Sequence, residues 1–346
     1  MNKVELNSFT LKGLEDYMCS IGEQRYRGEQ LFTYIHGNQG NDISGITVFS
    51  KTLRDKLHAL GKISKMEIFN RFDSKLDNTK KYLFLLEDDN IIEGVIMEYE
   101  HGLSACISTQ VGCRMGCAFC ASTKEGLVRN LSSGEMANQI YTMEKDLDGR
   151  ISNIVLMGSG EPLDNYENIL SFLNIIHDEK GHNTSYRNVT LSTCGIVPKI
   201  YRLAQEEIPI TLSISLHSPF DEIRRKIMPI GRKYSVEDII KACKYYNDRT
   251  NRRITIEYTL MEGINDRQED IHELVSLLRD MNCHINLIPL NPIKEFDRER
   301  PSHLSVSKFK KELTKANIPV TIRKEMGKDI NAACGQLRRS YTGNMH

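Results

Sequence analysis

Cys113-Arg-Met-Gly-Cys117-Ala-Phe-Cys120 places three cysteines within eight residues, spaced by three residues and then by two. Three thiolates on so short a loop can bind three corners of a cubane iron–sulfur cluster, whereas a cluster ligated only by protein takes four cysteines. Three ligands leave one iron open, and an open coordination position is where a substrate or cofactor binds and reacts. The spacing therefore favours an iron–sulfur cluster with an open iron.

A zinc knuckle, or a chance grouping of cysteines, is the alternative interpretation of this loop. Zinc in structural sites takes four ligands, often as two C-x2-C pairs or as a mixture of Cys and His. No histidine lies between Cys106 and Cys120, although Cys106 is itself a candidate fourth ligand. Zinc therefore stays open as the second interpretation.

The composition of this 346-residue chain limits the class of protein, because its length suits about two domains. The 46 basic residues balance the 46 acidic ones, so any RNA contact must come from local patches. No apolar signal segment begins the chain, and no run is long enough to span a membrane. Nine cysteines in such a chain indicate reduced thiols with metal-binding or catalytic roles. We therefore expect a cytoplasmic protein with no membrane partner.

The hydrophobic pattern divides the chain into three parts. Residues 1–65 show apolar residues at helical spacing, which predicts a small helical domain. Residues 66–100 hold two β-rich runs joined by the turn signal Asp88-Asp-Asn, which predicts a short antiparallel lead-in. Strands and helices alternate over residues 101–346, and this alternation predicts a parallel sheet.

We favour a partial (β/α) barrel over a doubly wound sheet for the third part. The first helix of this part is predicted to begin at the capping box Ser132-Ser-Gly-Glu135. The strand candidates are Ser104–Ser108, Asn153–Met157, Asn188–Ser192, Ile210–Leu216, Ile254–Leu260, His284–Leu290 and Val320–Arg323.

Polar or glycine-rich features follow these strands at their carboxyl ends. They are the three-cysteine loop, Gly158-Ser-Gly160-Glu161-Pro162, Ser192-Thr-Cys-Gly195, Ser215-Leu-His217, Asn291-Pro292 and Cys334. Each feature alone is typical of an ordinary turn or cap. In parallel α/β folds, however, active sites are built on this face of the sheet. Their common placement therefore predicts one shared site.

The glycine loop after the second strand lacks both the dinucleotide-binding fingerprint and the phosphate-loop lysine. Glycine allows backbone to approach a ligand closely. Glu161 is then a candidate acceptor for a ligand ammonium group, with an ordinary turn capped by Pro162 as the alternative.

The cysteines outside the loop divide into two groups. Cys106 lies on the strand before the loop, and Cys334 is flanked by small residues, which suits an accessible thiol. Cys19, Cys243 and Cys283 lie in helical or helix-end patterns, so we expect them to be small buried apolar residues. Cys194 stays ambiguous because it is close to Ser192.

Charged residues outside the strand ends have two possible roles. Basic residues gather between Lys51 and Lys65 and in the groups Arg224-Arg-Lys226, Arg232-Lys233, Arg323-Lys324, Lys328 and Arg338-Arg339. These are candidate phosphate contacts if the chain binds RNA, and otherwise they are solvated surface. Glu93 lies on a predicted strand, and we expect it to face water.

Taken together, the motifs resemble the RlmN family of the radical S-adenosylmethionine (SAM) superfamily over essentially the whole chain. The cysteine spacing, with Phe119 before the last Cys, is similar to the superfamily motif. The narrower matches are Gln110-Val-Gly-Cys-Arg-Met-Gly-Cys-Ala-Phe-Cys-Ala, Gly158-Ser-Gly-Glu-Pro-Leu, Leu191-Ser-Thr-Cys-Gly, Ser215-Leu-His-Ser and Asp329-Ile-Asn-Ala-Ala-Cys-Gly-Gln-Leu. The family methylates adenine C2 in 23S rRNA, at the peptidyl-transferase centre, and in some tRNAs at the position 3′ of the anticodon.

The resemblance implies the cofactors and the residues that bind them. Cys113, Cys117 and Cys120 would ligate a [4Fe–4S] cluster, whose open iron binds SAM. The residues implied to bind SAM are Gly160, Glu161, Ser192, Ser215, Leu216, His217 and Asn291. Two SAM molecules would be used in each turnover.

The resemblance also implies a covalent route. Cys334 would accept a methyl group from one SAM, and a radical derived from the second SAM would take a hydrogen from that S-methyl group. Cys106 would then resolve the protein–RNA adduct, leaving a transient Cys106–Cys334 disulfide. Glu93 aligns with a proton acceptor, residues 1–65 with an RNA-binding accessory domain, and a flavodoxin or ferredoxin is the expected electron donor to a monomeric enzyme.

Two alternatives to this reading stay open. A Cfr-type enzyme methylates adenine C8 with similar machinery, but Glu161-Pro162 favours the C2 reaction because Cfr-type proteins have alanine there. A non-catalytic iron–sulfur or zinc RNA-binding protein needs no extra thiols, so Cys106 and Cys334 argue against it. The sequence departs from the usual family pattern at Ser159 and Cys194, and neither departure removes a proposed ligand.

Overall fold

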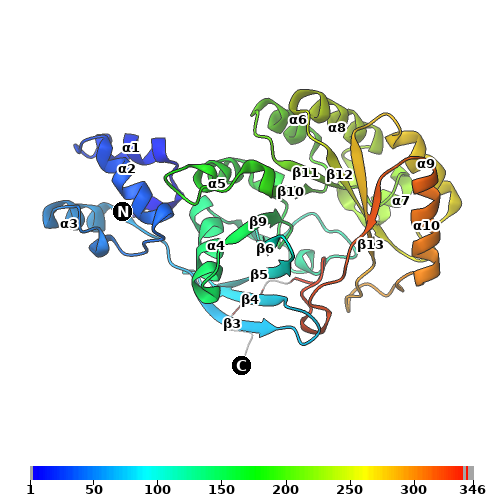
Figure 1. Ribbon diagram of the computed structural model, residues 1–346, viewed down its shortest axis with the longest axis horizontal. Coiled ribbons are helices and arrows are strands. Elements are labelled where there is room, and N and C mark those ends of the chain that lie inside the picture. The colour runs from blue at the N-terminus through cyan, green and yellow to red at the C-terminus, as the bar shows by residue number, and fades with distance from the viewer. Residues whose placement is uncertain (1–2, 338–339, 342–346) are drawn as a thin grey trace.

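One mixed β-sheet runs through the computed structural model, which describes residues 3–337 and 340–341 (Figure 1). Neighbouring strands follow the order β14-β13-β12-β11-β10-β9-β6-β5-β4-β3, and β15 pairs with β5. The strands of this sheet are β3 (Glu67–Asp73), β4 (Lys80–Leu85), β5 (Asn90–Tyr99), β6 (Gly102–Cys106), β9 (Ile151–Leu156), β10 (Val189–Thr193), β11 (Thr211–Ser215), β12 (Ile254–Leu260), β13 (Cys283–Pro289), β14 (Val320–Ile322) and β15 (Ser340–Tyr341). Two further pairs are β1 (Val4–Glu5) with β2 (Gly61–Lys62) and β7 (Gln110–Gly112) with β8 (Leu127–Asn130).

The strands from β6 to β14 pair in parallel and in sequence order, with a helix crossing between most neighbours. Since β14 ends the strand order on one side and β3 on the other, the described strands form an open, partial barrel, as predicted. The predicted strand bounds lie within two residues of those observed.

Helices pack on the outside of the parallel strands, with α6, α8, α9 and α10 grouped around β10–β13 (Figure 1). The helices are α1 (Leu11–Ser20), α2 (Tyr26–Phe32), α3 (Lys51–Leu60), α4 (Ser133–Leu147), α5 (Tyr166–His177), α6 (Val197–Gln205), α7 (Asp221–Ile227), α8 (Val236–Thr250), α9 (Gln268–Leu278) and α10 (His303–Lys315). None of these described helices has the length and apolar character needed to cross a membrane.

Alternation along the parallel strands separates core from site. On β12, Ile254, Ile256 and Tyr258 are fully buried in the main apolar core. The residues that alternate with them along β12 point to the opposite face of the sheet, because successive side chains of a strand point to opposite faces. Glu257 and Thr259 on that face line a cavity.

Strands β3 to β6 extend the sheet with antiparallel pairing, which confirms the predicted lead-in. The two β-rich runs are β4 and β5, but β3 was not predicted. Almost all of β3 is exposed, so it shows no alternation of apolar and polar residues, and a bulge between Ile68 and Asn70 interrupts its pairing with β4.

The three N-terminal helices lie at one end of the molecule, beside α4 and α5 (Figure 1). Polar contacts join the two regions: Ser133 Oγ donates to Ser8 O at 2.7 Å, and His36 Nδ1 lies 3.0 Å from Tyr141 Oη. Burial lowers the pKa of His36 to about 3, so this imidazole is neutral.

One expectation for the cysteines was wrong. Cys243 and Cys283 are buried, as expected, but Cys19 is exposed. Helix α1 buries Leu14 and Met18, four residues apart on one face. Cys19 follows Met18 by one residue, which turns its side chain about 100° away from that face.

Helix α4 begins at the predicted capping box. Ser132 Oγ accepts a hydrogen bond from Glu135 N at 3.1 Å, and Glu135 Oε2 accepts one from Ser132 N at 2.9 Å. We expect Ser132→Ala to lower the free energy of unfolding by about 1 kcal/mol, because it leaves a helix N–H without its acceptor. Urea unfolding measures this loss. Ser132→Thr keeps the hydroxyl and should stay close to wild type, and equal losses in both variants would contradict the capping role.

Candidate active site

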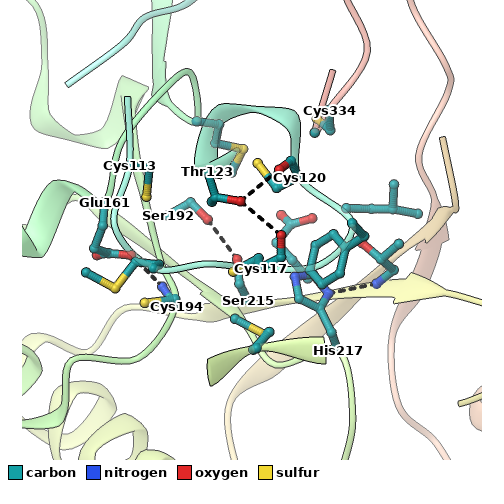
Figure 2. Close-up of a pocket in the computed structure, with 18 of the residues that line it drawn as sticks. Cys113, Cys117, Cys120, Thr123, Glu161, Ser192, Cys194, Ser215, His217 and Cys334 are labelled. Atoms are coloured by element: carbon teal, nitrogen blue, oxygen red, sulfur yellow. Dashed lines mark hydrogen bonds between the residues drawn. The ribbon is translucent and has the colours of Figure 1, made fainter. Parts of the chain in front are cut away.

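A cavity opens where the parallel strands end (Figure 2). Its lining includes most of the residues predicted from the strand ends: Cys113, Cys117, Cys120, Gly158, Gly160, Glu161, Ser192, Cys194, Ser215, His217, Asn291 and Cys334. The predicted convergence of these features on one site is therefore confirmed, while their individual roles stay predictions.

The loop with three cysteines follows β7, and main-chain hydrogen bonds hold it at the cavity. Cys113 N donates to Gly126 O at 3.0 Å, and Ala118 N donates to Ile227 O at 2.9 Å. Thr123 Oγ1 lies 3.1 Å from Cys117 O and 2.9 Å from Cys120 O, so its hydroxyl shapes the second half of the loop. Figure 2 shows the three thiol groups around the same cavity.

This donor set suits a cluster better than a single ion. Among residues 3–337 and 340–341, no three Cys, His, Asp or Glu side chains are placed to ligate one metal ion. In a cubane each cysteine binds a different iron, so three thiols spread over a cavity wall match a cluster. Burial raises the pKa of Cys113 to about 12 and raises that of Cys117 and Cys120 as well. Bound iron would supply positive charge that favours the thiolate form at these positions.

The glycine loop after β9 passes in contact with the chain that leads from β6 to the cysteine loop. A Cβ on Gly158 would meet Ile107 O at 2.7 Å. Gly160 has φ +113°, and a Cβ there would meet Thr109 Oγ1 at 2.6 Å. Both glycines are therefore required by close packing of backbone, and the loop is more than an ordinary turn.

Glu161 is a buried carboxylate in the cavity wall. Its Oε2 accepts from Cys194 N at 2.7 Å, and its Oε1 accepts from Leu163 N at 3.0 Å. Burial raises its pKa despite these bonds, which lower it. A buried acid of this kind favours a cationic partner, and an ammonium group in the cavity would supply one.

Hydroxyl groups and a histidine come from the next two strands. Ser192 Oγ on β10 lies 3.4 Å from Ser215 Oγ at the end of β11. His217 has φ +56°, and its Nδ1 accepts from Thr259 N at 2.9 Å, which leaves the proton on Nε2. Burial lowers the pKa of His217 to about 3, and its ring packs edge-on against Phe119 of the cysteine loop, 4.8 Å between centroids.

Asn291 and Cys334 meet across the cavity from the glycine loop. Asn291 Nδ2 donates to Cys334 O at 3.0 Å, so this amide holds the segment that carries the thiol. Cys334 is half-buried in the cavity wall, consistent with the accessible thiol expected from its small neighbours.

Three predicted site residues are not part of the described cavity lining: Leu216, Cys106 and Glu93. The Leu216 side chain is fully buried in the main core. Cys106 packs in a small apolar cluster with Met326 and Leu337. Burial raises the pKa of Cys106 to about 12, with the charge of Cys334 as the second cause.

Glu93 was expected to face water, and this expectation was wrong. The residue is 6 % exposed, and its Oε1 lies 3.7 Å from Lys81 Nζ. β5 is an inner strand between β4 and β6, and Glu93 lies on the same face as Val95, which packs with Cys106. Glu93 therefore shares a face of the sheet with Cys106.

Two arginines were interpreted as phosphate contacts or solvated surface, and the structure corrects this interpretation for Arg224. Arg224 is fully buried: its Nη2 donates to Cys194 O at 2.6 Å and its Nε to Leu216 O at 3.3 Å. It therefore joins the ends of β10 and β11. Arg323 lines the cavity. The pair Arg338-Arg339 lies outside the described residues.

The sequence interpretation missed Glu257. This buried carboxylate on the inner face of β12 accepts from Ser213 Oγ and from Asn286 Nδ2, both at 2.9 Å. Arg323 Nη1 lies 3.8 Å from its Oε2. The nearby thiol of Cys334 and Glu257 both raise the pKa of Arg323, so its charge is retained. The sequence could have indicated Glu257, because it is a charged residue in the middle of an otherwise mostly apolar predicted strand.

Comparisons with known proteins show the family to which the chain belongs. Residues 107–276 match the radical SAM superfamily, and residues 4–63 match the ribosomal RNA large subunit methyltransferase N-terminal domain. A probable dual-specificity RNA methyltransferase RlmN from Alkaliphilus oremlandii is 53% identical over 345 residues, covering 99% of this chain and 100% of the relative. Another from Clostridioides difficile is 51% identical, covering 98% of each chain.

A solved structure extends the likeness to the fold. The crystal structure of a radical SAM methyltransferase from Sphaerobacter thermophilus superposes with a TM-score of 0.91 at 39% identity, covering 96% of this chain and 99% of the other. The cofactors of the radical SAM superfamily are a [4Fe–4S] cluster and SAM, and the three-cysteine cavity fits them. By sequence over its whole length and by fold, the chain belongs to the RlmN family.

Proposed function

We propose that this protein is a radical SAM methyltransferase acting on C2 of an adenosine in 23S rRNA, at the peptidyl-transferase centre, and of the adenosine 3′ of the anticodon in tRNAs. The observation that carries the proposal is the placement of Cys334 in the same cavity as Cys113, Cys117 and Cys120. A cluster protein that only binds RNA has no need of this additional thiol.

In this proposal the cavity holds both cofactors. Cys113, Cys117 and Cys120 ligate the cluster, and the residues that contact SAM are Gly160, Glu161, Ser192, Ser215, Leu216, His217 and Asn291. The buried Glu161 carboxylate suits the ammonium group of SAM, and the paired hydroxyls of Ser192 and Ser215 suit its polar atoms. Leu216 contributes only through its main chain, because its side chain is in the core.

The cluster and SAM, when bound, supply a 5′-deoxyadenosyl radical. Adenine C2 is electron-poor, so it does not attack the methyl group of SAM directly. A thiolate is a good nucleophile. The Cys334 thiolate takes the methyl group of one SAM, which leaves as S-adenosylhomocysteine. This radical would be able to take one hydrogen atom from the S-methyl group, so that Cys334 would carry the methylene group that bonds to C2.

The remaining steps release the RNA. The adduct would give up one electron to the oxidised cluster, which balances the electron used to cleave SAM, and a proton from C2, for which we propose Glu93 as acceptor. The Cys106 thiolate attacks the Cys334 sulfur, so that an S–S bond forms. The C–S bond breaks with its electron pair on the methylene carbon, which takes a proton and becomes the methyl group. Two electrons from a reductant then restore both thiols.

The partners follow from this chemistry. The first electron requires a donor such as a flavodoxin or ferredoxin, and the RNA substrates place the enzyme in the cytoplasm. We propose a monomer in three parts: residues 1–65 as an RNA-binding accessory domain, 66–100 as the antiparallel lead-in, and 101–346 as the catalytic barrel.

Nucleoside mass spectrometry tests the proposed function. Anaerobic reactions would contain cluster-loaded protein, SAM, a reductant and either a 23S rRNA fragment or tRNA. We expect 2-methyladenosine in both RNA pools. Formation of 8-methyladenosine alone would instead assign the Cfr-type reaction, and cleavage of SAM without methylated RNA would overturn the substrate assignment.

Cys334→Ala separates cluster binding from methyl transfer. We expect iron and sulfide content to match wild type, because Cys334 is not a proposed ligand, and RNA methylation to fall below detection, because no other group accepts the methyl. Cys19→Ala, which removes an exposed thiol outside the cavity, should methylate normally. Methylation by Cys334→Ala at the wild-type rate would exclude the covalent route.

Cys106→Ala tests the release of the adduct. Without a thiol to attack Cys334, the C–S bond to RNA should persist, so denaturing electrophoresis should show RNA crosslinked to protein. Cys283→Ala, another buried cysteine, is the matched control and should give free product. Only free, fully methylated RNA from Cys106→Ala would remove its resolving role.

A further inference from the structure

Cys334 lies on a segment between β14 and Leu337 that has no regular secondary structure apart from a short 3-10 turn at Lys328–Ile330. Such a segment has many accessible conformations. The position of the thiol therefore depends on the contacts that hold the segment at each end.

One end of the segment is held by the turn that joins β3 to β4, residues 74–79, which we name the hairpin turn. Ser74 Oγ donates to Asp329 Oδ1 and Lys75 N donates to Asp329 Oδ2, both at 2.7 Å. Gly327 N donates to Asp77 Oδ2 at 3.0 Å. Two carboxylates thus accept three hydrogen bonds that join the turn to the segment.

The hairpin turn is itself well organised for this contact. Ser74 Oγ accepts from Leu76 N at 3.1 Å and from Asp77 N at 3.2 Å, and Asp77 Oδ1 accepts from Thr79 N at 2.9 Å. A Cβ on Gly327, which has φ +60°, would meet Thr79 Cγ2 at 2.8 Å. The turn and the segment are therefore packed closely as well as hydrogen-bonded.

The other end of the segment is held by the chain that follows the three-cysteine loop. Ala121 N donates to Gly335 O and Ser122 Oγ donates to Leu337 O, both at 2.7 Å. Together with the bond from Asn291 to Cys334 O, these contacts fix the carboxyl side of the thiol. On its amino side, Arg300 Nη1 donates to Glu325 Oε2 and Met326 packs against Cys106. The hairpin turn bonds to Gly327 and Asp329, which lie closer to Cys334 in the sequence than Glu325 and Met326 do.

We propose that the hairpin turn is a clamp for the methyl-carrying segment, with Asp329 and Asp77 as residues that position Cys334 in the cavity. Neither carboxylate lies in the cavity lining, so both act through the segment. This inference rests on the proposed function, in which the same sulfur must meet SAM, then adenine C2, then Cys106. Small displacements of a reacting atom slow a reaction steeply, by as much as ~100-fold for about 1 Å.

We expect substitutions of the clamp residues to leave the protein folded. Asp329 is exposed, and the core clusters contain none of the clamp carboxylates or their partners. Asp329→Ala removes two of the three hydrogen bonds, and Ser74→Ala removes one. Ser74→Thr keeps the hydroxyl and is the conservative variant.

Hydrogen–deuterium exchange of the purified full-length chain is the first measurement. We expect Asp329→Ala to speed exchange in peptides covering residues 326–337, with no change in peptides from β9 to β13. Asp178→Ala is the matched control. Asp178 also accepts a main-chain hydrogen bond, from Lys180 N. It lies in the turn after α5, at the amino ends of the parallel strands and therefore away from the cavity.

The second measurement is the rate of S-methylation of Cys334, followed by peptide mass spectrometry after cluster-loaded protein is mixed with SAM and reductant. We expect a fall of about tenfold in Asp329→Ala, a smaller fall in Ser74→Ala, recovery in Ser74→Thr and no change in Asp178→Ala. The SAM concentration at half-maximal rate should stay the same in all of them, since the cavity is intact.

The outcomes separate this inference from the proposed function. If wild-type Cys334 accepts no methyl group, the proposed function fails, and the exchange data alone decide whether the clamp exists. If wild-type Cys334 is methylated and Asp329→Ala matches it in both rate and exchange, the clamp is excluded while the proposed function stands. Faster exchange with an unchanged methylation rate would also exclude the positioning role.

Discussion

The geometry of the site depends on the contact between two stretches of backbone, residues 107–110 after β6 and 158–161 after β9. Gly158 N donates to Ile107 O at 3.0 Å, Thr109 N donates to Ser159 O at 2.8 Å, and Glu161 N donates to the Gln110 side chain at 2.8 Å. One stretch leads into the cysteine loop and the other ends at the buried carboxylate. Since no Cβ fits at Gly158, the distance between the thiols and Glu161 is set by main-chain packing rather than by flexible side chains.

Charge is the second constraint on this cavity. Cys113, Cys117 and Glu161 are buried around it, and burial raises the pKa of each. Arg323 and two neutral donors contact Glu257, whereas Glu161 accepts hydrogen bonds from neutral donors that include Cys194 N and Leu163 N. Arg224 lowers the pKa of Cys117 and Lys124 lowers that of Cys120, but burial outweighs both effects. Iron and a ligand ammonium would add positive charge beside these groups. The arrangement therefore favours the cofactors of the family over an empty cavity.

Local patterns predicted the parallel part of the fold because strand alternation, helix spacing and the Ser132 capping box depend on neighbouring residues. The convergence of the cavity residues was also predictable, since parallel strands present their carboxyl ends on one face. The predictions failed for residues whose burial depends on distant parts of the chain. Glu93 was expected to face water because nothing near it in sequence shows that its face packs against other segments. Arg224 was taken for surface because its partners, the carbonyls of Cys194 and Leu216, lie on other elements.

The difference between local motifs and contacts from distant parts of the chain also applies to the active-site cavity. The three-cysteine loop and the glycine loop are local motifs at the ends of adjacent strands, and a sequence motif is enough to locate them. Cys334 reaches them from a part of the chain more than 170 residues away from both, on a segment that the barrel does not order by itself. Its position is set by contacts from the hairpin turn, Asn291 and the chain after the cysteine loop. In the proposed reaction the Cys334 thiol meets SAM, adenine C2 and Cys106 in turn. An irregular segment held by a few hydrogen bonds suits this role better than a strand does, because those bonds can break and re-form without disturbing the core. The irregular end of the chain is therefore as much a part of the site as the barrel that contains it.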